Sequence, residues 1–216
     1  MTIAVSIPIN LSGRKEIAET LLAKYGTGYL FLGRTFQETA TNQSCEIDIH
    51  NNEDGTKQII CLTSSDVGYE ACLTMARFVR VFLQIGGSVV KLKSAQLDWE
   101  ADKWLAQYNS QDVFDIYSLY VGLIEGENSY YSCGMHNFGK ADVSLEAEED
   151  IGLAVYVMNV FNYYRLTESP ILQDEHSFKP DIESPSYKMR WIRDLEYDED
   201  SLLYNPHGRW HLNRIR

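Results

Sequence analysis

The sequence lacks the short motifs by which the common enzyme classes are recognised. Its 216 residues contain no Gly-x-x-x-x-Gly-Lys-Ser/Thr phosphate loop, no Gly-x-Ser-x-Gly nucleophile turn and no His-Glu-x-x-His zinc helix. The Gly-Thr-Gly run at 26–28 lacks the third glycine of a dinucleotide loop and lies on the wrong side of its predicted helix. We therefore expect no catalytic residue set and no cofactor, and we place an enzyme second among the functional hypotheses.

Cysteine is scarce and scattered. The four cysteines are Cys45, Cys61, Cys72 and Cys133, and no two of them form a Cys-x-x-Cys pair. This placement predicts buried free thiols in a reducing compartment. Cys133 and His136 have the spacing of a metal-binding pair, but zinc needs three or four ligands and no second pair is present. We expect no metal site.

Long hydrophobic runs are missing as well. No segment reaches the roughly 18 uninterrupted apolar residues that a membrane span needs. Residues 1–8 lack the basic and apolar parts of a signal peptide. With the scattered cysteines, this predicts a cytoplasmic protein without membrane contact.

Basic residues are outnumbered, with 19 Lys and Arg against 31 Asp and Glu, which gives a formal net charge of −12. Such a charge repels the phosphate backbone, so we expect no nucleic-acid partner. The same field attracts a basic protein partner. The alternative is that surplus acid only keeps the protein in solution.

Hydrophobic residues make up 44% of the chain, enough for a large core. Two strongly apolar segments predict helices buried against a sheet, one near 68–85 that Asp66 would cap and one near 148–164. We expect an α+β fold with a mixed or antiparallel sheet. It would form one compact domain over 1–216, with two packed and similar sheet-plus-helix halves at 1–110 and 111–216.

Strand and turn signals surround these helices. Residues 45–50 and 57–63 predict a hairpin, because Asp54-Gly55 supplies a tight turn. A second hairpin is expected from 119–124 and 130–138, and further strands at 187–193 and 209–215. The polar stretch from Thr35 to Ser44 is expected to be an exposed loop.

Three histidines in turn-forming contexts are the candidate pocket residues of the C-terminal half. His136 lies between Gly134 and Gly139, His176 follows Asp174-Glu175, and His207 follows a proline. Together with Asp142 they would line a pocket if the fold brings them together, as a general base or metal set. The alternative is that each ring only stabilises its own turn.

Arginine and tryptophan gather near the C-terminus. Arg190, Trp191, Arg209 and Trp210 are the candidate partner-binding residues, since these residue types dominate binding hot spots. The alternative is core packing by the tryptophans and solvation of the arginines.

Three segments carry a resemblance: the Gly-Ser-Val-Val-Lys-Leu run at 87–92, the Cys-Gly-Met-His-Asn-Phe-Gly-Lys-Ala-Asp run at 133–142, and the Asn-Pro-His-Gly-Arg-Trp run at 205–210. Over about residue 68 to the end, the chain resembles an uncharacterised bacterial family known as a domain of unknown function. The resemblance implies a cytoplasmic location and transfers no activity or site residue. Small acidic bacterial proteins of such families include immunity partners of secreted toxins.

These observations favour a non-enzymatic cytoplasmic protein that binds a macromolecular partner, of the kind in which an immunity protein neutralises a bacterial toxin. The second hypothesis is an enzyme or small-ligand-binding protein with a histidine-lined pocket in the C-terminal half. The sequence leaves the oligomeric state open.

Overall fold

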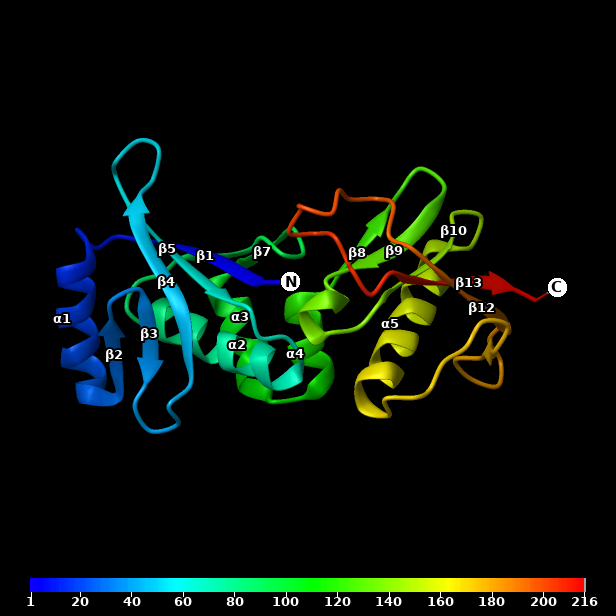
Figure 1. The fold of residues 1–216 in the computed structure, drawn as a ribbon, viewed down its shortest axis with the longest axis horizontal. Coiled ribbons are helices and arrows are strands. Elements are labelled where there is room, and N and C mark those ends of the chain that lie inside the picture. The colour runs from blue at the N-terminus through cyan, green and yellow to red at the C-terminus, as the bar shows by residue number, and fades with distance from the viewer. Residues whose placement is uncertain (216) are drawn as a thin grey trace. The chain divides into compact units, whose positions relative to one another are not determined.

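The computed structural model describes residues 1–215, and its contacts divide the chain into two compact units. The N-terminal unit is Thr2–Leu119, and the C-terminal unit begins at Tyr120 and includes Met1. Each unit has its own β-sheet with helices beside it (Figure 1). The predicted α+β class is therefore confirmed.

The N-terminal unit is built on a seven-stranded sheet in which neighbouring strands are antiparallel, in the order β2-β3-β4-β5-β1-β6-β7. The strands are β1 (Ile3–Ile9), β2 (Tyr29–Leu32), β3 (Thr35–Glu38), β4 (Ser44–Asn51), β5 (Gln58–Ser64), β6 (Val89–Leu92) and β7 (Leu97–Glu100). β4 and β5 confirm the hairpin predicted at 45–50 and 57–63. Gly55 in its turn has a φ of 71°, a conformation that glycine adopts without strain.

The helices of this unit include α2 (Tyr69–Leu83), which packs on the sheet through apolar side chains. The others are α1 (Arg14–Tyr25), the short 3-10 helix η1 (Gly26–Gly28), α3 (Ala101–Ser110) and α4 (Val113–Tyr120). α2 contacts β1 and β5 and buries Met75, Phe78 and Phe82, which confirms the helix predicted near 68–85. The predicted cap is wrong: Gly68 is the N-cap, without a side-chain bond, and Asp66 lies two residues earlier.

The exposed loop predicted from Thr35 to Ser44 is confirmed only for residues 39–43. Thr35–Glu38 forms β3, which pairs with β2 and β4. Phe36 is fully buried, and its ring lies 5.5 Å from Tyr29 and 4.8 Å from Phe82, measured between ring centroids. One buried ring therefore anchors a strand whose other side chains are polar.

The C-terminal unit has a six-stranded mixed sheet in the order β11-β12-β13-β10-β9-β8. The strands are β8 (Gly122–Glu125), β9 (Ser129–Cys133), β10 (Asp142–Glu146), β11 (Ser177–Phe178), β12 (Tyr187–Ile192) and β13 (Arg209–Arg214). β10 and β13 are parallel, and the other neighbours are antiparallel. The predicted hairpin and the two predicted C-terminal strands are confirmed, with two exceptions: residues 119–120 end helix α4, and 135–138 is the 3-10 helix η2 (Met135–Phe138).

The long helix of this unit is α5 (Ile151–Thr167), which confirms the helix predicted near 148–164. The Asp150 carboxylate caps it by accepting a hydrogen bond from the Leu153 amide at 3.0 Å. One face of α5 packs on β10, β12 and β13 through Val157, Met158 and Phe161. Both units thus combine a sheet with a long helix, but their strand orders and strand directions differ. No helix within residues 1–215 is long and apolar enough to cross a membrane.

Candidate functional site

Asp142 is the centre of a buried polar cluster in the C-terminal unit. It begins β10 and is almost fully buried. Its carboxylate accepts hydrogen bonds from the Ser132 hydroxyl at 2.8 Å, the Met135 amide at 3.2 Å and the Asn205 side-chain amide at 2.6 Å. Burial raises the pKa of Asp142, and the three donors oppose that rise. These bonds join β9, η2 and the segment before β13 to one carboxylate.

A buried ion pair continues the cluster. The Arg209 guanidinium contacts Asp194 at 3.1 Å, and both side chains are almost fully buried. Arg209 also lies over the Tyr131 ring, 4.4 Å from its centroid. The second Asp194 oxygen accepts a hydrogen bond from the backbone amide of Asn205 at 3.0 Å. Asn205 therefore links the two buried carboxylates, Asp142 through its side chain and Asp194 through its backbone. The network therefore fixes the long connection between β12 and β13 onto the sheet.

Two of the three predicted histidines belong to this cluster and the third does not. His136 lies in η2, with only 2% of its surface exposed. Burial lowers its pKa to about 4, while the nearby Asp194 carboxylate opposes the shift and His207 adds to it. Burial also lowers the pKa of His207, and the Asp142 charge opposes that shift. His136, His207 and Asp142 are therefore neighbours, whereas His176 is exposed and lines a separate cavity.

The carboxylate at the centre of this cluster is buried and hydrogen-bonded. Asp142 and His136 are closed off from solvent, and the carboxylate already has three donors. Burial raises the pKa of the Cys133 thiol to about 12, so this thiol is protonated at neutral pH. Within residues 1–215, no three His, Cys, Asp or Glu side chains are grouped to hold a metal ion. The buried part of the cluster holds the β12–β13 connection in place, and His207 is half-buried at its edge.

The four predicted partner-binding residues point in different directions. Trp191 pairs with Trp210 across β12 and β13, while Arg190 pairs with His211 and Arg209 with Ile192. Because side chains alternate along a strand, the tryptophans lie on the face that α5 covers and Arg190 on the opposite face. Arg190 and Trp191 are exposed, Trp210 is half-buried, and Arg209 is buried. They do not form one continuous surface.

The outer face of α5 is an exposed apolar surface that does not include any of the four predicted partner-binding residues. No charged residue occurs between residues 151 and 164. Ile151, Val155, Tyr156, Tyr163 and Tyr164 are exposed, while the inner face packs on the sheet. The signal in the sequence is that α5 is apolar nearly all round, which is typical of a helix covered on both sides. We call these five residues the α5 outer face.

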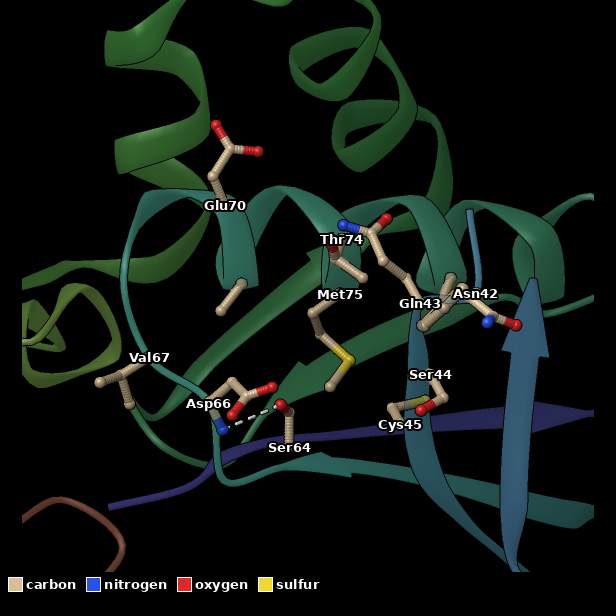
Figure 2. A pocket seen from close by; sticks show the side chains of 12 residues that line it. Asn42, Gln43, Ser44, Cys45, Ser64, Asp66, Val67, Glu70, Thr74 and Met75 are labelled. Carbon is tan, nitrogen blue, oxygen red and sulfur yellow. Dashed lines mark hydrogen bonds between the residues drawn. The ribbon is translucent and has the colours of Figure 1, made fainter. Parts of the chain in front are cut away.

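The N-terminal unit has an open cavity of about 400 Å³ between α2 and the ends of β4 and β5 (Figure 2). Met75 and Cys45 supply its apolar part, and burial raises the pKa of the Cys45 thiol to about 12. Asp66 and Glu70 are its charged lining residues, and the Asp66 amide donates to the Ser64 hydroxyl at 3.2 Å. The lining therefore contains two carboxyl side chains, and its cysteine is a protonated thiol at neutral pH.

Comparison with protein-family models, with curated proteins and with solved structures gives no match for this chain.

Proposed function

We propose that this chain is a non-enzymatic cytoplasmic protein that binds a basic protein partner, of the kind in which an immunity protein neutralises a bacterial toxin. The observation that carries the proposal is the α5 outer face. Several exposed apolar side chains grouped on one helix are a feature of protein-interaction sites. Val155 is 38% and Tyr163 is 37% exposed, so large apolar side chains are available to a partner.

The charge around this face supports a basic partner. Residues 120–216 contain 17 acidic and nine basic residues, so this unit carries most of the negative charge of the chain. Asp150 caps the start of α5, and Asp181 accepts a hydrogen bond from the Tyr156 hydroxyl at 2.8 Å. An apolar strip bordered by carboxylates suits a partner with apolar anchors and surrounding Lys or Arg.

The immunity assignment rests on the same charge. A toxin that acts on nucleic acid needs a basic surface, and an acidic protein that covers this surface would neutralise it. The four free cysteines support a reducing compartment, where such a protein protects its own cell. The closed Asp142 cluster supports a binding function over a catalytic one.

The test is a binding assay with the purified products of adjacent genes. Val155→Lys places a like charge in the contact with a basic partner, and we expect at least a tenfold weaker affinity with little loss of stability, because Val155 is exposed. Leu195→Lys is the matched control, since Leu195 is 85% exposed in the same unit but outside α5. If no product binds, or if Leu195→Lys weakens binding as much as Val155→Lys, the proposal is wrong.

The second candidate is a small-ligand-binding protein, and one observation favours it. His176 lines a cavity of about 400 Å³ in the C-terminal unit, together with Phe161 and Phe178. His136 and His207 are not part of that lining. Of the three histidines predicted to line a pocket, this cavity therefore includes His176 alone.

A further inference from the structure

Two neighbouring cavities flank residues 170–172, just after α5. The larger, of about 400 Å³, has a mainly apolar lining that includes Phe161, Tyr164 and Phe178. The smaller, of about 210 Å³, is lined by Lys140, Ala141, Arg165, Pro170, Leu172 and Trp210. Pro170 and Leu172 line both cavities, so the two cavities lie next to each other. We call the pair the 170–172 groove.

Two positively charged side chains, Lys140 and Arg165, line the smaller cavity. Arg165 is buried and fixed, because it donates to the Ala141 carbonyl at 2.7 Å and lies 4.6 Å from the centroid of the Phe161 ring. Lys140 follows η2, and its ammonium group reaches the Ser169 hydroxyl at 3.5 Å. Burial and the charge of Arg165 both lower the pKa of Lys140. Two like charges in contact with a cavity favour a bound anion.

Local charge in the groove is opposite to that of the unit. No Asp or Glu is among the lining residues of either cavity, although the unit is strongly acidic. Lys140 makes no ion pair within 4.0 Å among residues 1–215. Lys179 and His176, at the larger cavity, add a cation and a titratable ring. An anion that enters this groove therefore meets cations and no carboxylate of the lining.

We propose that the 170–172 groove binds a small amphiphilic carboxylate, with the carboxylate at Lys140 and Arg165 and the apolar chain in the cavity lined by Phe161 and Phe178. An aromatic and aliphatic cavity with a few convergent polar groups is the usual form of a small-ligand site. The Arg165 guanidinium also donates to the Asn162 side-chain oxygen, so it is held in place before an anion binds, which reduces the entropy lost on binding. The larger cavity shares Tyr164 with the α5 outer face, whereas Lys140 and Arg165, which would bind the carboxylate, lie outside that face.

The test uses octanoate as the probe and isothermal titration calorimetry on the full chain. Octan-1-ol, which has the same chain without the charge, measures the apolar contribution alone. We expect the parent to bind octanoate at least tenfold more tightly than octan-1-ol. Lys140→Met removes the cation while keeping a side chain of similar length, and we expect it to reduce octanoate affinity at least tenfold and to leave octan-1-ol affinity within twofold.

Two further variants keep the test decisive. Leu172→Asp places a carboxylate at the junction of the cavities and should abolish octanoate binding. Lys57→Met makes the same charge change in the exposed β4–β5 hairpin of the N-terminal unit, and it should bind octanoate like the parent. Urea unfolding of each variant confirms that it is folded. Equal affinity of the parent for octanoate and octan-1-ol, or a Lys140→Met variant that binds octanoate like the parent, would overturn the inference.

Discussion

Histidine 136 illustrates how burial changes the chemistry of a residue. Its ring is enclosed by the polar cluster, and its pKa of about 4 keeps it neutral at physiological pH. In the unfolded chain the same ring titrates near its ordinary value of about 6.5. The unfolded state therefore binds more protons than the folded state between these two values. Its contribution to stability is fully present above pH 6.5 and is lost as the pH falls toward 4.

This difference predicts a pH dependence that one substitution removes. Between pH 7.5 and 4.5, we expect the free energy of unfolding of the parent to fall by about 2–3 kcal/mol more than that of His136→Gln, since the ring has a pKa of about 4 in the folded state and about 6.5 in the unfolded state. Urea denaturation at both pH values measures it. Other titrating groups are common to both proteins, so they cancel in the comparison. Equal losses would mean that His136 becomes protonated in the folded protein without penalty.

For single residues, the sequence predicts the local backbone conformation better than it predicts whether a side chain is buried. The glycines on either side of His136 predict a turn, and the turn is present, with Gly134 at φ 125° and Gly139 at φ 69°. The burial of His136 was not predictable from this pattern, because the groups near its ring, Asp194 and His207, lie 58 and 71 residues further along the chain. Arg209 is similar, because its buried partner Asp194 lies 15 residues earlier and no motif connects the two.

Among the elements, the connection between β12 and β13 depends on a close approach at Gly208. Gly208 has a φ of 74°, and its amide and carbonyl bond Asn205 and Asp142. A Cβ atom there would lie 2.5 Å from the Ile192 carbonyl oxygen and 2.6 Å from the Trp191 ring. No real Cβ contact is that short, so the connection must move to accommodate any other residue.

We expect Gly208→Ala to lower the free energy of unfolding by about 3 kcal/mol, of which roughly 1 kcal/mol is the left-handed backbone and the rest the collision. Gly33→Ala is the control, because Gly33 has a φ of 64° but nothing within 4 Å of an added Cβ. It should lose only the backbone part. Urea denaturation of both variants tests the prediction, and equal losses would show that the Trp191 contact yields without strain.

The elements that the sequence predicts well are those with long, one-sided or turn-bounded patterns. α2 and α5 follow from their apolar composition, and the β4–β5 hairpin follows from Asp54-Gly55. β3 is missed because its single core residue, Phe36, gives no periodic pattern in four residues. The exposure of the α5 outer face could not be predicted either, because a helix that is apolar nearly all round does not show which of its faces the sheet covers.

For the whole molecule, the main feature is the uneven charge. The boundary between the two halves is predicted from the sequence near residue 110. In the structure, the boundary between the two compact units follows Leu119, close to the end of α4. No glycine- or proline-rich linker marks that place, so composition gives no signal there. Counted by unit, the acidic surplus lies mainly from residue 120 onward, in the unit that carries the α5 outer face. Long-range attraction of a basic partner would therefore act toward this unit.

Electrostatic steering predicts how binding of the partner depends on salt. We expect the association rate constant to fall at least tenfold between 50 and 500 mM NaCl, while the dissociation rate constant, which depends on apolar contacts, changes about twofold or less. Surface plasmon resonance measures both. Glu148→Lys, beside the start of α5, should slow association more than Glu53→Lys, an equal charge change in the exposed hairpin of the other unit. An association rate that ignores salt, or equal effects of the two variants, would mean that the acidic surplus serves only solubility.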